Sequence, residues 1–407
     1  MNTTGQEDIM NRSKEDTKYV FSPPLYSPVL APIFHWLSDV YYLRRKHKVI
    51  GVRAISGSEK LRQLYTNGDS ILITPNHSDH SDPNTLINLS RRYKMPMHFV
   101  AAREIFERKK GLHGALLQRA GAFSIDREGS DIRAIKEIMR ILYEARFPLV
   151  MFPEGEIYHT NAKLTPLNEG AASMALKIAA KFQKESRNKK VFIVPTAMKY
   201  SYLDDISVTF ADRLTRLENS ISWAAQSDLN VVDRIYKFGE AVLALKEKEF
   251  LNKTIEGPID KRLHEFRETL ITNEEKRYFS DTDNGNHPTR IRRLRGKIRT
   301  ILLDENKPSA EIIENCYKSL DNIYMAVMLY SYPGQYLKNN PSMDRIAETI
   351  HKFEEDAFGD SSIQGRRTVE VTFCDPIDLT DHAKSRSKSV AGKVTSIIET
   401  CIKNILE

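Results

Sequence analysis

The sequence predicts an α/β fold: a mixed sheet flanked by helices, with an all-α helical unit inserted into it. Over residues 70–210, short apolar runs alternate with helix-like segments, which is typical of a sheet with helices packed on its faces. From about residue 214 the pattern changes to charged helices with few strand signals. An alternating segment, TVEVTF at 368–373, then follows. We expect this segment to return to the sheet, which makes the helical unit an insertion.

The strands are predicted from buried-type apolar runs. Five are Ser70–Thr74, Met97–Ala101, Ala122–Ile125, Leu149–Phe152 and Val191–Val194. Helical patterns lie between them, for example at 131–145 and 168–185. The segment ISVTF (206–210) resembles TVEVTF and is predicted as a further strand immediately before the helical unit.

These patterns divide the chain into four parts. We expect a disordered tail at 1–20 and an α/β domain at 21–213 and 366–385. The helical insertion covers 214–365, and a C-terminal helix covers 386–407.

The helical insertion contains a weak internal repeat. Residues 234–251 match 262–279 at an offset of 28, and 290–303 begin a looser third copy. Arg234 aligns with Arg262, and Glu247 with Glu275. A repeated amphipathic unit of this length predicts an array of antiparallel helices.

Charge and cysteine content indicate the general class of protein but do not identify its binding partner. The net charge of +7 suits an anionic membrane surface, nucleic acid or the phosphates of coenzyme A. The three cysteines are far apart, which predicts neither a disulfide framework nor a cysteine zinc site, and a reducing cytosol fits best. The N-terminus lacks the apolar core of a secretory signal. No apolar run reaches the roughly 20 residues that span a bilayer.

Residues 29–42 are apolar and aromatic, and they are followed by the basic run 44–48. Such a helix can lie in a membrane interface with its basic end at the lipid head groups. A core-packing helix with a solvated basic end is the alternative.

The first candidate for catalysis is the segment NHSDHSDP at 76–83, directly after the first predicted strand. A neutral histidine accepts a proton near pH 7, and a carboxylate that fixes its tautomer improves it as a base. His77 and Asp82 have a spacing that a tight loop can close. Two alternatives stay open: Asp82 as a helix cap before Pro83, or the loop's histidines and aspartates as metal ligands.

Three other segments lie at the ends of predicted strands. FPEG (152–155) combines a carboxylate, Glu154, with Gly155, whose backbone N–H can be exposed after a strand. GAFSIDR (121–127) places Arg127 where it can bind phosphate, or pair with Asp126 on the surface. VPTA (194–197) is a strand running into a turn.

Together and in this order, the four segments resemble the blocks of the glycerol-phosphate and lysophosphatidate (1-acylglycerol-3-phosphate) acyltransferase family. Those blocks are His-x4-Asp, Gly-x-x-Phe-Ile-Asp-Arg, Phe-Pro-Glu-Gly and a Val-Pro strand, and the resemblance covers about residues 50–210. With its helical unit, the chain resembles a long form of the family.

The resemblance implies roles for individual residues. His77 is then the general base and Asp82 its orienting partner. Arg127 and Arg103 bind the acceptor's phosphate, while Glu154 and Gly155 shape the acceptor site. Acyl transfer is direct, and no metal or organic cofactor is expected.

The resemblance also implies partners and a location. The donor is acyl-CoA or acyl carrier protein, and the acceptor is a lysophosphatidate-like lysolipid of phospholipid synthesis. We expect a cytoplasmic protein, peripheral to the inner face of a membrane, that binds the membrane surface and no nucleic acid.

One departure from the family pattern affects the acceptor. The family continues Phe-Pro-Glu-Gly with Thr-Arg-Ser, whereas this chain has Glu156-Ile157-Tyr158. The change removes one cation and adds a carboxylate. An acyltransferase for a non-phosphate lipid, or a thioester hydrolase that uses the same residues, is the alternative.

Overall fold

The computed structural model describes residues 19–107, 112–127, 131–282, 285–304, 308–332, 334–359, 361–384 and 389–407. Its described residues form two compact units. The α/β unit takes in 19–157, 161–203 and 366–407, and the helical unit takes in 158–160 and 204–365. The tail predicted at 1–20 lies outside the described residues except for Tyr19 and Val20. The predicted domain boundaries stay a prediction.

The described part of the α/β unit contains one mixed sheet, with strand order β1-β7-β6-β2-β5-β3-β4 and β8 beside β6. The strands are β1 (Val49–Ser56), β2 (Ser70–Pro75), β3 (His98–Ala102), β4 (Ala122–Ile125), β5 (Leu149–Val150), β6 (Val191–Tyr202), β7 (Arg367–Phe373) and β8 (Ile377–Asp378). The predicted mixed sheet and its five predicted strands, β2 to β6, are confirmed. Strand β1 was not predicted.

The return of the chain to the sheet is also confirmed. Strand β7 lies between β1 and β6, parallel to β1 and antiparallel to β6. The predicted strand ISVTF is wrong, because Ser207–Thr209 is a 3₁₀ turn and Phe210 begins a helix. The carboxylate of Asp205 accepts hydrogen bonds from the Ser207 N–H (3.0 Å) and O–H (2.6 Å). This local turn starts the helix and outweighs the strand-like alternation.

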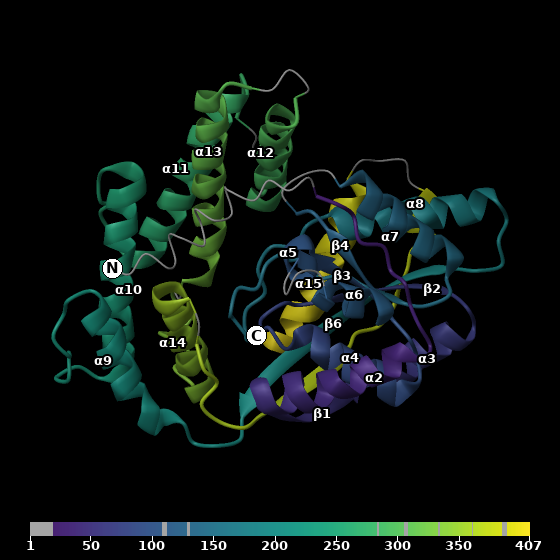
Figure 1. Cartoon of the computed structure of the whole chain (residues 1–407), viewed down its shortest axis with the longest axis horizontal. Helices are drawn as coiled ribbons and strands as arrows, with labels where there is room; N and C mark the ends of the chain where they lie inside the picture. The colour runs from purple at the N-terminus through teal and green to yellow at the C-terminus, as the bar shows by residue number, and fades with distance from the viewer. Residues whose placement is uncertain are drawn as a thin grey trace. The chain divides into compact units, whose positions relative to one another are not determined.

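Helices cover both faces of the sheet (Figure 1). Leu72 of β2 packs in one core with residues of α7, α8 and α15, whereas its neighbours Ile71 and Ile73 pack in the other core with residues of α3 and α4. A strand buried on both faces needs apolar residues on both, which explains the continuous run SILIT. The helices are α2 (Leu30–Leu37), α3 (Ser58–Thr66), α4 (Asp82–Tyr93), α5 (Arg103–Glu107), α6 (Leu112–Arg119), α7 (Ile132–Glu144), α8 (Gly170–Lys184) and α15 (Val390–Leu406), and a π-helix (Ser38–Lys46) continues α2.

The helical unit contains a succession of helices, labelled in Figure 1. They are α9 (Phe210–Ser220), α10 (Val231–Leu251), α11 (Ile259–Tyr278), α12 (His287–Leu302), α13 (Ala310–Met328) and α14 (Met343–Phe358). Contacts join consecutive members from α9 to α13.

The internal repeat corresponds to a repeated ion pair. At each of three successive junctions, a buried glutamate near the end of one helix pairs with an arginine near the start of the next helix. The pairs are Glu218–Arg234 (2.7 Å), Glu247–Arg262 (2.8 Å) and Glu275–Arg290 (2.9 Å). Each arginine donates from two of its nitrogens to the two oxygens of one glutamate, which fixes the orientation of the two side chains as well as their separation. The repeat therefore specifies how neighbouring helices join.

Candidate active site around His77

The loop between β2 and α4 brings His77 and Asp82 together. His77 Nδ1 lies 2.9 Å from Asp82 Oδ2, with the histidine side chain 15% exposed and the aspartate side chain fully buried. With Nδ1–H donating to the carboxylate, the lone pair of the neutral ring is on Nε2. That atom forms no hydrogen bond with any described residue. The pair thus has the geometry of a histidine base held in one tautomer.

The Asp82 carboxylate is fully occupied by protein donors. Oδ2 also accepts from the backbone N–H groups of Ser78 (2.9 Å) and Asp79 (3.0 Å), and Oδ1 accepts from the hydroxyl of Tyr200 (2.7 Å). Asp82 is the first residue of α4, and Ser81, at the N-cap position, forms no side-chain capping hydrogen bond. The donors to the Asp82 carboxylate come from the loop and from β6, which suits a role in orienting His77.

Tyr200 is a site residue that the sequence analysis missed. Burial raises the pKa of its hydroxyl well above the usual value, as does the neighbouring Asp82 charge, so it acts as a neutral donor. Strand β6 extends beyond its pairing with β2, which stops at Thr196. Beyond that point two side-chain amides form hydrogen bonds with the backbone of β6. The Asn76 amide bonds to the N–H and C=O of Met198, and the Asn161 amide bonds to the N–H and C=O of Tyr200. The loop and the strand are therefore locked in register.

A second missed residue, Arg367, holds the same loop from the returning strand β7. Its guanidinium donates to Asp79 Oδ2 at 2.6 Å and to the backbone carbonyl of His47 at 3.0 and 3.2 Å. Burial alone would raise the pKa of the Asp79 carboxyl, but Arg367 holds it well below its usual value. Asp79 and Arg367 are 288 residues apart in the chain, so no local pattern links them.

Glu154 of the FPEG segment forms a hydrogen bond with the loop between β2 and α4. Its Oε1 accepts from the His77 backbone N–H at 2.6 Å, and its Oε2 accepts from the backbone N–H (3.1 Å) and hydroxyl of Thr165. Burial raises the pKa of this carboxyl to about 7. The Phe152 ring stacks on the His77 ring with centroids 4.1 Å apart. Both carboxylate oxygens of Glu154 are thus hydrogen-bonded within the protein. The next residue, Gly155, has a φ of +83°, a left-handed backbone conformation that glycine adopts without strain.

Arg127, the expected phosphate ligand, lies beside this turn. One of its nitrogens donates to the Gly155 carbonyl and to Glu156 Oε2, each at 2.8 Å. A second nitrogen lies 3.8 Å from Glu104. The Arg127 side chain is one-third exposed and therefore reachable by a ligand.

Arg103, the second expected phosphate ligand, is also paired with carboxylates. It lies 3.7 Å from Asp126 and 3.6 Å from Glu104. The structure therefore brings the two arginines into one cluster with three carboxylates, those of Glu104, Asp126 and Glu156.

The apolar N-terminal helix exposes one face. The buried side of α2 and the π-helix packs on α4: Ser38 donates to Asn84 (2.6 Å), and Asn88 donates to Asp39 (2.8 Å). The opposite side exposes 44–72% of each of Val29, Leu30, Ile33, Trp36, Leu37, Val40 and Tyr41. Exposed basic residues, Arg44, Arg45 and Lys46, end the segment. Within the described residues, no helix is long and apolar enough to cross a membrane.

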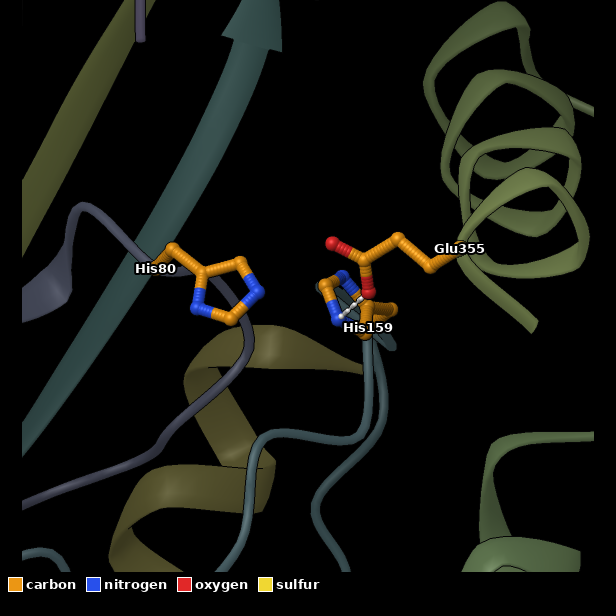
Figure 2. A group of neighbouring side chains, drawn as sticks. All are labelled: His80, His159 and Glu355. Carbon is orange, nitrogen blue, oxygen red and sulfur yellow. Dashed lines mark ion pairs between the residues drawn. The ribbon is translucent and has the colours of Figure 1, made fainter. Parts of the chain in front are cut away.

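A separate group of ionisable side chains lies in the helical unit. His159 Nε2 lies 2.9 Å from Glu355, the pair joined by the dashed line in Figure 2. His351 lies 3.6 Å from the other oxygen of Glu355. The remaining residue drawn, His80, belongs to the α/β unit. His159 and His351 are buried. The Glu355 carboxylate therefore gives a partner to ring nitrogens that would be costly to bury alone.

The described fold and loop define an α/β domain with a histidine–carboxylate pair at the end of a central strand. That position is typical of reactive groups in such sheets. Comparison with protein families agrees: residues 52–199 match the family model described as Acyltransferase. The match supports an acyltransferase domain over these residues and, in general terms, an enzyme that transfers acyl groups. A search of curated proteins finds no significant match.

Proposed function

We propose that this protein transfers a fatty acyl group from acyl-CoA or acyl carrier protein to a hydroxyl of a lysolipid. The observation that carries the proposal is the His77–Asp82 pair at 2.9 Å, with the second ring nitrogen directed away from the carboxylate. It lies inside the region that matches the acyltransferase family.

The proposed reaction is a single displacement. His77 Nε2 takes the proton from the acceptor hydroxyl as its oxygen attacks the thioester carbonyl carbon. Asp82 stabilises the imidazolium that forms. The tetrahedral intermediate then collapses, the C–S bond breaks, and the departing sulfur takes the proton from His77. The products are an ester and a free thiol, and the base is regenerated.

A transfer assay tests the proposal. Radiolabelled acyl-CoA and acyl carrier protein are offered with a panel of lysolipids, and acylated product is separated from free fatty acid. We expect transfer by the wild type and loss of at least about a thousandfold in His77→Ala, since general-base assistance and the orientation it requires are both removed. His382→Ala, a histidine outside the loop, is the matched control. Free fatty acid as the sole product would instead identify a thioester hydrolase.

We also propose that the protein works at the cytoplasmic, inner face of a membrane, held there by α2 and the π-helix. The support is the exposed face of seven apolar and aromatic residues followed by three exposed basic residues. Apolar side chains of this kind insert at the head-group boundary, and lysine and arginine favour anionic lipids.

Vesicle flotation tests membrane binding. We expect the protein to float with phosphatidylglycerol-containing vesicles, and a variant carrying both Ile33→Glu and Trp36→Glu to remain at the bottom of the gradient. Ile397→Glu, at a similarly exposed isoleucine of α15, is the matched control and should float. Equal flotation of all three proteins would remove this helix from the proposal.

A further inference from the structure

The Arg127–Glu156 pair bears on which acceptor the site takes. Among the residues that the structure describes, the guanidinium of Arg127 contacts Glu156 at 2.8 Å and Glu104 at 3.8 Å. The same nitrogen that meets Glu156 also donates to the Gly155 carbonyl. A phosphate that bound Arg127 would have to compete with these acceptors for the donors of this side chain.

The carboxylates of the cluster are unfavourable for a phosphate. Among the described residues, Glu104, Asp126 and Glu156 lie at ion-pair distances from Arg103 and Arg127. A phosphate monoester adds a charge of about −1.5 to −2 near pH 7. Like charges at ion-pair distances repel, and at a partly buried site water screens this repulsion incompletely.

The same cluster suits hydroxyl donors. Carboxylate oxygens accept hydrogen bonds, and the carboxylates of Glu156 and Glu104 lie 2.8 Å and 3.8 Å from Arg127. The side chains of Arg127 (33% exposed), Glu156 (24%) and Glu104 (40%) are reachable from solvent. An uncharged head group with several hydroxyls, such as a sugar or glycerol, can donate to these oxygens without displacing the ion pair.

We propose that Glu156 determines acceptor specificity: by holding Arg127, it directs the enzyme to a lipid with an uncharged, hydroxyl-bearing head group and against a phosphate monoester. The inference rests on the proposed acyl transfer and names its acceptor class. It also makes a prediction about anion binding that does not require turnover.

The test compares wild type, Glu156→Gln and a control, Glu144→Gln. The control removes a carboxylate that pairs with Arg140 at 2.6 Å on the surface of α7. Transfer is measured with monoacylglycerol, a monoacyl glycosylglycerol and lysophosphatidate as acceptors. Binding of glycerol 3-phosphate is measured separately by calorimetry.

We expect the wild type to prefer the two uncharged acceptors. Glu156→Gln should raise kcat/KM for lysophosphatidate about tenfold or more, the effect of one charge-assisted hydrogen bond, and should tighten glycerol 3-phosphate binding in parallel. Glu144→Gln should change neither quantity. A wild type that prefers lysophosphatidate, or a Glu156→Gln variant whose preference and anion affinity are unchanged, overturns the inference while leaving acyl transfer intact. If no acceptor is acylated, the proposed function fails, and the calorimetry alone decides whether Glu156 keeps phosphate from Arg127.

Discussion

Replacing Tyr200 with phenylalanine removes a single oxygen from the proposed catalytic unit. The Tyr200 hydroxyl donates to Asp82 Oδ1 at 2.7 Å and also contacts the Thr85 hydroxyl at 3.1 Å. A hydrogen bond to a charged group contributes about 1.5–3 kcal/mol, and both partners are buried here. The ring remains to fill its space, so the backbone should keep its position.

We expect Tyr200→Phe to lower kcat about 10- to 100-fold, which corresponds to about 1.4–2.7 kcal/mol. Asp82 would keep three of its four donors. The loss should fall on kcat and leave KM nearly unchanged, because a less well-oriented base slows proton transfer without changing how the substrates bind.

The assay measures initial transfer rates over a range of substrate concentrations, with circular dichroism to check folding. Tyr143→Phe is the matched control, because the Tyr143 hydroxyl also donates to a carboxylate, Glu185 at 2.9 Å, but on the surface of the unit. We expect the control to behave as wild type. A Tyr200→Phe enzyme with kcat within twofold of wild type would refute the assignment of Tyr200 as a positioning residue.

Two further predictions concern the contacts that hold the loop. Arg367→Met should destabilise the protein by about 3–5 kcal/mol in denaturant unfolding, because it removes the cation from the Asp79 carboxylate, whose side chain is only 14% exposed. Adding Asp79→Asn should recover part of the loss, and full stability of the single variant would contradict this. The pKa of Glu154 is raised from 4.5 to about 7, so its contribution to stability is full below pH 4.5 and is lost as pH rises through 7. The unfolding free energy of wild type relative to Glu154→Gln should therefore fall by about 2–3 kcal/mol between pH 5 and pH 8, and a constant difference would argue against a titrating Glu154.

Local sequence patterns were sufficient for most of the sheet. The run SILIT and its four counterparts are short, apolar and bounded by helical patterns, and they form β2 to β6. The failure at ISVTF has a local cause as well, since the Asp205 side chain turns the backbone there. The order of the strands and the place of β7 between β1 and β6 depend on long-range packing that alternation alone does not encode.

By itself, the sequence determined which chemistry the loop after β2 can support, because His77, Asp82 and their spacing are contained in a few consecutive residues. Only the tertiary structure decided what surrounds that pair. Tyr200 and Arg367 reach the loop from β6 and β7, and Glu154 takes the His77 backbone N–H instead of remaining open to a substrate. The physical reason is that a buried carboxylate must find its donors wherever the folded chain places them. Those donors come from strands that are distant in sequence and adjacent in the sheet.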